Sequence, residues 1–229
     1  MSQKISVSYG RNFLYLNFFY FSLIKRKRTE VFNIFCREIN PKKSETILDI
    51  GTTSSIDEHE NLIIGKYPHK SKISCLSNQQ LKKVQIKYPA IKTYKGDGKN
   101  LKFKNNAFDY SISSATIEHV GSFAEQARFV KESYRVAKKK VFITTPNRFF
   151  PIDFHTRLPF IHWLPKTIHR KILNFLGENY LNKEKNLNLL DSRELSKICD
   201  SIGIKKYKIY RLNFLGMCSN LLLTIDKKN

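Results

Sequence analysis

The chain is short of cysteine and of acidic residues for its 229 residues. No cysteine forms a C-x-x-C pair or lies near a histidine cluster at metal-ligand spacing. This pattern excludes a cysteine-based zinc site and is typical of buried thiols in a reducing compartment. We therefore expect a cytoplasmic protein without a metal site. The cysteines are Cys36, Cys75, Cys199 and Cys218.

Aspartate and glutamate together number 19, against 41 lysines and arginines, and the formal net charge is +22. Two interpretations of this imbalance stay open. The lysines are spread along the whole chain, as compositional drift with solvated side chains would leave them. A charge of this size would also attract phosphate-rich partners such as nucleic acid, or an anionic membrane surface.

Long hydrophobic runs are also lacking. The most apolar stretch, residues 13–24, has about 12 residues where a membrane-spanning helix needs roughly 20. A basic run, residues 25–28, follows this stretch, and no cleavage site is visible, which argues against a secretory signal. We expect residues 13–28 either to pack on the domain as an aromatic segment or to contact the inner face of a membrane.

No repeat and no Gly/Ser-rich or Pro-rich linker divides the chain, so its length fits one domain with short additions. Seven segments have the apolar pattern of strands, and helical patterns alternate with them. The alternation predicts an α/β, Rossmann-like fold: a seven-stranded, mostly parallel sheet with helices on both faces. The expected strands are 46–50, 73–76, 91–94, 108–113, 140–145, 204–212 and 221–225, and the expected helices are 29–39, 122–136 and 193–202.

Three parts of the chain depart from this alternation. The last two strands leave no room for a helical crossover, so they should form an antiparallel C-terminal hairpin. Residues 1–40 are expected to be an N-terminal segment and helix ahead of the main domain, 41–229. Residues 147–190 have many aromatics and no strand pattern. Because they leave from the carboxyl end of a strand, where open α/β sheets bind ligands, we predict a substrate-side insertion.

Short motifs follow three of the predicted strands. The first strand ends in Asp49-Ile50-Gly51, where the glycine permits a sharp turn and the close approach of a ligand. The third strand is followed by Gly96-Asp97-Gly98, a carboxylate between two glycines that suits capture of a flat base. The fourth ends in small residues and then meets Glu118-His119-Val120. Each motif is weak alone, but their order and spacing are specific.

Together these motifs resemble the class I S-adenosylmethionine-dependent methyltransferases, in particular the group typified by ubiquinone and menaquinone biosynthesis. Segments 49–51, 96–103 and 108–120 are similar to that family's D-x-G, GDAxxLPF and FDxVxxxxxxEHV stretches. Segment 145–165 is similar to a bacterial branch that continues TPNRWFPxxFHTxLPxxHWLP. The resemblance implies that residues 41–229 form a methyltransferase domain with S-adenosyl-L-methionine as its cofactor.

The resemblance also implies roles for individual residues. Asp49, Gly51 and Thr52 would hold the methionine and ribose portions of the cofactor. Asp97 and Gly98 would bind its adenine.

Ser113 and Ser114 would line the floor of the pocket beneath the sulfonium. Two departures from the family pattern weaken the expected grip on the cofactor. Thr53 and Ser55 replace glycines that are usual in the first motif. Asn78 stands where an acid usually binds both ribose hydroxyls, and it would be a neutral substitute.

Two histidines are candidates for catalysis. A histidine side chain is available in its neutral form near pH 7, so His119 would serve as a base or as a contact to the acceptor. Its alternative role is packing beside the helix that follows. His155 would face the acceptor if the insertion roofs the pocket, and otherwise it belongs to a structural loop.

The leading hypothesis is methyl transfer to a small-molecule or lipid-linked acceptor. The net charge of +22 keeps an RNA or protein methyltransferase open as an alternative, although no appended nucleic-acid module is visible. The replaced glycines of the first motif keep a third hypothesis open, a non-catalytic binding protein with a methyltransferase-like fold.

Overall fold

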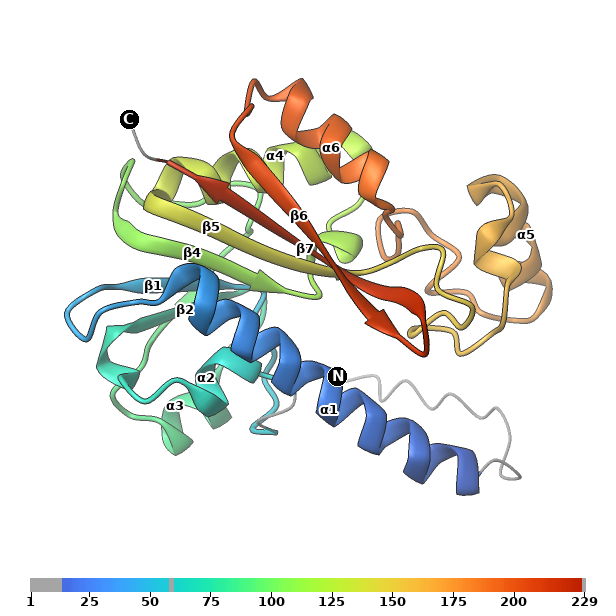
Figure 1. Cartoon of the computed structure of the whole chain (residues 1–229), viewed down its shortest axis with the longest axis horizontal. Helices are drawn as coiled ribbons and strands as arrows, with labels where there is room; N and C mark the ends of the chain where they lie inside the picture. The colour runs from blue at the N-terminus through green and yellow to red at the C-terminus, as the bar shows by residue number, and fades with distance from the viewer. Residues whose placement is uncertain (1–13, 58–59, 228–229) are drawn as a thin grey trace.

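The computed structural model describes residues 14–57 and 60–227, with side chains from residue 26 onward. A single seven-stranded sheet runs through the molecule in the order β3-β2-β1-β4-β5-β7-β6 (Figure 1). Strands β1 to β5 pair in parallel, and β7 pairs antiparallel with both β5 and β6. The strands are β1 (Ile47–Ile50), β2 (Ile73–Ser77), β3 (Lys92–Lys95), β4 (Phe108–Ser114), β5 (Ala137–Pro146), β6 (Tyr207–Phe214) and β7 (Met217–Asp226).

This architecture confirms the predicted α/β fold and its C-terminal hairpin. The central strands β1 and β2 are buried along their whole length, as their apolar sequences require for strands covered on both faces. The edge strand β3 is largely exposed and carries lysine at both ends, which blunts an open sheet edge.

Helices cover both faces of the sheet (Figure 1). On one face lie α4 (Phe123–Val136) and α6 (Ser192–Ser201), which pack with Phe129 and Leu195 in one hydrophobic core. Both helices begin with a reciprocal capping box, and α4 uses Ser122 and Glu125 for it. The opposite face is covered by α1 (Leu14–Ile39), α2 (Leu62–Lys66) and α3 (Lys82–Lys87).

Helix α1 corrects the expected boundary at residue 29, because the helix begins at Leu14. No glycine or proline occurs between residues 11 and 40 to interrupt it. Phe35 is fully buried against the sheet, and the helix ends where Asn40 adopts a positive φ of 43°. Residue 13 and the side chains of residues 14–25 lie outside the described part, so both interpretations of residues 13–28 stay predictions. None of the described helices has the length and apolarity that crossing a membrane requires.

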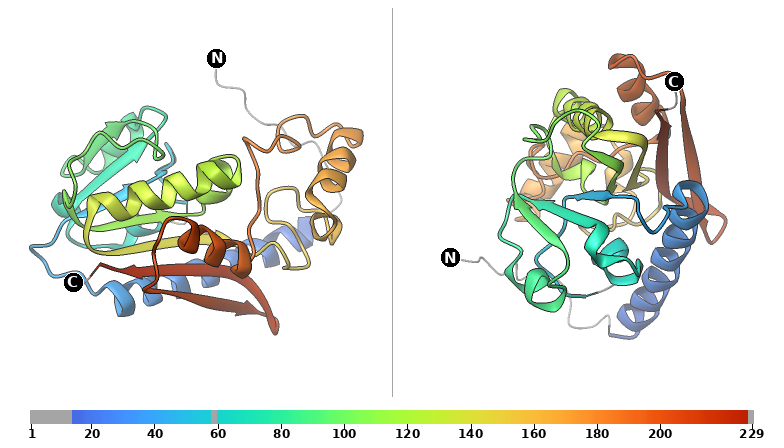
Figure 2. Two further views of the ribbon diagram at one scale, coloured as in Figure 1. Left: turned by 90° about the horizontal axis from the view of Figure 1, so that it is seen from above. Right: turned by 90° about the vertical axis from the view of Figure 1, so that its left-hand side faces the viewer.

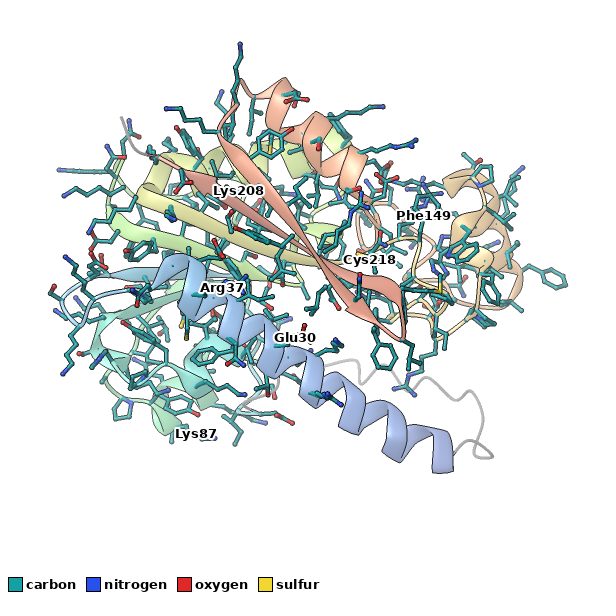
Figure 3. The ribbon with its side chains drawn as sticks, viewed as in Figure 1. Glu30, Arg37, Lys87, Phe149, Lys208 and Cys218 are labelled. Atoms are coloured by element: carbon teal, nitrogen blue, oxygen red, sulfur yellow. The ribbon has the colours of Figure 1, made fainter. Side chains whose placement is uncertain are left out.

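The segment 147–190 lies beyond the end of the sheet toward which β4 points (Figures 1 and 2). It contains the short helix α5 (Lys166–Phe175), which stands apart from the sheet. Asn147 fastens its start to β7 by donating from Nδ2 to the Cys218 carbonyl at 2.9 Å. Cys218 and Phe149 are labelled in Figure 3. We call residues 147–190 the insertion from here on.

Candidate active site

A cleft of about 720 Å³ lies at the carboxyl ends of the parallel strands, where ligands bind in open α/β sheets. Loops that follow strands β1, β2 and β3 form one side of it, through residues 51–54, 77–79 and 95–99. We call these loops the strand-loop wall. The turn after β4 and the insertion form the other side, the insertion wall. It comprises Ala115, Thr116, His119, Val120, Tyr180, Lys185 and Asn186.

Gly51 is the point where the two walls touch. It has a φ of +92°, a conformation that favours glycine, and its amide donates to the Leu76 carbonyl at 2.9 Å. A Cβ at this position would lie 2.2 Å from Oγ1 of Thr116. The turn after β1 therefore packs against the turn after β4 at a distance that only glycine allows.

The loop after Gly51 is held by a side chain that the sequence analysis did not single out. Asn61 is buried, and its Oδ1 accepts a hydrogen bond from the Thr53 amide at 3.0 Å. Its Nδ2 donates to the carbonyls of Thr53 and Ser55, at 3.0 and 2.6 Å. This clamp fixes the loop in which two motif glycines are replaced. No local pattern marks Asn61, because it lies six to eight residues beyond its partners.

Asp49 lies behind the cleft and does not line it. Burial disfavours its charged form and raises the pKa of this carboxyl to about 7, although the nearby Thr52 hydroxyl acts in the opposite direction. Thr52 itself lines the cleft. The structure thus separates two residues that the family resemblance groups together.

Asp97 and Gly98, expected beside the adenine, and Asn78, expected beside the ribose hydroxyls, all line the cleft. Asp97 has a side chain that is 60% exposed, and its Oδ1 accepts a hydrogen bond from the Lys99 amide at 2.9 Å. Gly98 has no room for a side chain, since a Cβ there would lie 2.6 Å from the ring of Phe129. Asn78 is exposed on the same wall.

The two serines expected beneath the sulfonium do not line the cleft. Ser113 is buried and donates from Oγ to the Ile50 carbonyl at 2.8 Å, which ties β4 to β1. Ser114 accepts a hydrogen bond from the Thr144 hydroxyl at 3.3 Å. Strand β4 continues through Ser114, and the chain turns only at Ala115, where φ is +49°. This corrects the sequence-based placement by one or two residues, because Ala115 and Thr116 provide this part of the lining.

His119 and His155, the two catalytic candidates, come together although 36 residues separate them. Their Nε2 atoms are 3.1 Å apart, and their rings meet edge to face. Only His119 lines the cleft, and its Nδ1 is 2.7 Å from the Asn186 carbonyl. His155 is mostly buried behind it, with its Nδ1 3.1 Å from Oδ1 of Asp153.

Buried carboxylates surround this histidine pair. Glu118 has no exposed side-chain surface, and its Oε2 accepts from the Thr145 hydroxyl at 2.9 Å. Burial opposes charge on His155, but the hydrogen bond to Asp153 and the charge of Glu118 outweigh it and raise the pKa of His155. Burial would raise the pKa of Asp153, yet hydrogen bonds from the ring and amide of His155 and from the Thr156 hydroxyl hold it well below the usual range.

The insertion is anchored to the residues around the histidine pair by backbone contacts. The Asn188 amide donates to the Glu118 carbonyl at 2.7 Å. Gln126, fully buried on α4, donates from Nε2 to the carbonyls of Ile117 and Asn188, at 3.1 and 2.8 Å. His119 and the returning part of the insertion are therefore held as one unit.

Comparison with known proteins agrees with this geometry. Residues 65–144, which run from the end of α2 into β5, match the family model described as a methyltransferase domain. No curated protein matches the sequence.

Several solved structures share the fold. Magnesium protoporphyrin IX methyltransferase from Synechocystis PCC 6803, with bound SAH, is 10% identical at a TM-score of 0.57, covering 89% of this chain and 83% of that one. A SAM-dependent methyltransferase from Thermotoga maritima is 16% identical at a TM-score of 0.55, covering 93% and 96%. Phosphoethanolamine N-methyltransferase 2 from Haemonchus contortus is 12% identical at a TM-score of 0.59, covering 88% and 53%.

At identities this low, the solved structures show only that the fold is shared. The match of residues 65–144 to the family model is, in addition, a similarity of sequence. That segment contains the Gly96–Gly98 turn, Glu118 and His119, all of which the structure places at or beside the cleft. Residues 65–144 therefore match a methyltransferase domain in sequence, and the chain shares the fold of these solved S-adenosylmethionine-dependent methyltransferases.

Proposed function

We propose that this enzyme transfers the methyl group of S-adenosyl-L-methionine to a small-molecule or lipid-linked acceptor. One observation supports this most directly: loops from four neighbouring parallel strands meet in a single cleft of about 720 Å³. Cofactor and small-molecule pockets have volumes of this order, roughly 300 to 1,000 Å³. We also propose that residues 41–229 are the catalytic domain.

The proposed cofactor position follows the strand-loop wall. Adenine would lie against Asp97 and Gly98, the ribose beside Asn78, and the methionine portion beside Gly51 and Thr52. The sulfonium methyl would then point toward the insertion wall, where His119 lies. The cofactor already carries its leaving group, so the protein has mainly to align donor and acceptor and to exclude water.

The proposed acceptor position is supported by the surface of the insertion. The insertion exposes several large apolar side chains outside the cleft lining, and such groups suit an acceptor with a hydrophobic part or contact with a membrane surface. We therefore propose a cytoplasmic enzyme that meets a membrane peripherally. These side chains are Phe160, Trp163, Leu164, Ile168 and Phe175.

Two measurements test the proposal. Calorimetry of the full chain with S-adenosylhomocysteine should give one site with micromolar affinity, and Asp97→Ala should weaken it. Extract incubated with methyl-labelled cofactor should then carry label in the small-molecule or lipid fraction. Label that is lost on nuclease or protease treatment would instead support RNA or protein as the acceptor. No binding at millimolar cofactor would indicate a non-catalytic relative.

A further inference from the structure

Three hydrogen-bond acceptors converge where the insertion meets the turn after β4. The first is Oε1 of Glu118, which is buried and has no hydrogen-bond partner among residues 14–57 and 60–227. The other two are the Nε2 atoms of His119 and His155, at 4.0 and 3.7 Å from that oxygen. A fully buried carboxylate oxygen without a partner is costly, so this cluster requires an explanation.

The protonation of Nδ1 determines whether Nε2 of each neutral ring carries a proton or a lone pair. Nδ1 of His119 faces the Asn186 carbonyl, and Nδ1 of His155 faces the Asp153 carboxylate. Both partners only accept hydrogen bonds, so both Nδ1 atoms must carry the proton. In the neutral rings each Nε2 then has a lone pair, and these two atoms are 3.1 Å apart. Three electron-pair donors thus lie together with no hydrogen to share among them.

A proton on one Nε2 would join the two nitrogens at 3.1 Å, but at 3.7 and 4.0 Å it would still leave Oε1 of Glu118 without a hydrogen bond. One metal ion could be bound by all three atoms. Sides of 3.1, 3.7 and 4.0 Å join the three atoms. A circle through them has a radius of about 2.1 Å, which matches bonds from Zn²⁺ to imidazole nitrogen and carboxylate oxygen.

The groups behind the three donors also match a metal site. Metal-binding histidines almost always donate their other ring N–H to a carboxylate or a backbone carbonyl, as Asp153 and Asn186 allow here. The Thr145 hydroxyl orients the remaining oxygen of Glu118. Two imidazoles and one carboxylate suit zinc, manganese or ferrous iron, whereas magnesium prefers oxygen ligands alone.

We propose that Glu118, His119 and His155 form a binding site for one divalent transition-metal ion, with positions left open toward the cleft. His119 lines the cleft, so the ion would be accessible from the space expected for the acceptor. Glu118 and His119 lie in the turn after β4, whereas His155 belongs to the insertion, so an ion bound by all three would also fix the insertion to that turn.

A metal ion at this site implies that the atom methylated on the acceptor is an oxygen. This part of the inference rests on the proposed function. A metal ion lowers the pKa of a bound hydroxyl, so the hydroxyl proton would leave to solvent. A lone pair on the deprotonated oxygen would then attack the methyl carbon and form the new O–CH₃ bond. The electrons of the breaking C–S bond would remain on sulfur, giving S-adenosylhomocysteine and the methyl ether or ester.

Metal binding is measured on the full chain after EDTA treatment and buffer exchange. Calorimetry with Zn²⁺ or Mn²⁺ should give one site with micromolar or tighter affinity, and Co²⁺ should give a visible absorption band. Mg²⁺ should bind at least a hundredfold more weakly. Glu118→Gln and His155→Gln should each weaken Zn²⁺ binding by more than tenfold.

Two further variants separate loss of the metal site from loss of the fold. Because Glu118 is buried and its replacement can disturb the fold, His119→Gln provides the same loss at a position that is 37% exposed. His69→Gln is the matched control, since it removes one imidazole outside the cluster and should leave Zn²⁺ affinity unchanged. Equal affinity in wild type and all three cluster variants, or no Co²⁺ band, would overturn the metal site and leave a shared proton instead. Cofactor binding in EDTA, measured separately, decides the proposed function independently.

Discussion

The strand-loop wall and the insertion wall of the cleft differ in how the chain builds them. In the strand-loop wall each loop directly follows its own strand, so residues near each other in sequence make the surface. In the insertion wall His119 meets Asn186 and, behind it, His155, and these contacts span 67 and 36 residues. The first wall is thus fixed by local backbone geometry, and the second by packing between distant segments.

The largest effect is expected where the walls touch. Gly51→Ala places a Cβ 2.2 Å from Thr116 and strains a φ of +92°. We expect cofactor affinity to fall by more than a hundredfold in calorimetry, with a loss of about 2–3 kcal/mol in unfolding free energy. Gly203→Ala is the control for strain alone, because Gly203 has a φ of +75° and no atom near its would-be Cβ. Similar effects of the two substitutions would show that the walls do not depend on this contact.

A pH-dependent effect should follow from Asp49 behind the strand-loop wall. Its folded-state pKa of about 7 lies above the usual value near 3.9. The folded chain therefore holds the proton more strongly, and wild type loses stability as the pH rises from about 4 to 7. Asp49→Asn lacks this loss, so its unfolding free energy should gain about 2 kcal/mol relative to wild type between pH 5 and 7. If denaturant titrations showed the same pH dependence of the unfolding free energy for both proteins, the raised pKa of Asp49 would be contradicted.

His119 tests whether the insertion wall acts on the acceptor. We expect His119→Ala to change the affinity for S-adenosylhomocysteine by no more than about twofold, because the proposed contacts of that molecule lie on the strand-loop wall. Methyl transfer should fall by about twentyfold, less than the ~10²–10⁴-fold typical for loss of a general acid–base group, because the cofactor already carries its leaving group. The readouts are calorimetry and label incorporation. Unchanged turnover would return His119 to a packing role.

Asp97 gives the opposite pattern. Its side chain is largely exposed and accepts one hydrogen bond from the Lys99 amide, so Asp97→Ala should leave the melting temperature nearly unchanged. Cofactor affinity should fall by more than tenfold, through loss of the adenine contact. Wild-type affinity in this variant would remove Asp97 from the cofactor site and would blur the division between the two walls.

The smallest effect is expected at Asn78. Replacing its amide with a carboxylate, Asn78→Asp, should strengthen cofactor binding about threefold, because a carboxylate accepts ribose hydroxyls better than a neutral amide does. Asn100→Asp, which adds the same charge outside the cleft lining, is the control. Equal gains in both variants would point to net charge as the cause.

The predictable parts of the site are those with a local physical reason. The strand pattern fixed the sheet, and Gly51, Asp97 and Gly98 could be placed because a turn directly after a strand leaves little freedom. Ser113 and Ser114 were misplaced because β4 runs further than its apolar pattern indicates. The helices α2 and α3 were not predicted, since five or six residues carry too weak a periodic signal. Helix α5 was also missed although it is as long as the predicted α6, which begins with a capping box that α5 lacks.

The sequence by itself determined the order of the strands, the turns that line one wall, and the match of residues 65–144 to a methyltransferase domain. Only the tertiary structure decided that Asn61 clamps the first loop and that Glu118, His119 and His155 converge. Because 36 residues separate His119 from His155, these three residues match no ligand motif, and for this reason the sequence predicted no metal site. Such contacts depend on how the insertion packs back onto the sheet, and a packing arrangement between distant segments leaves no periodic or local mark in the chain.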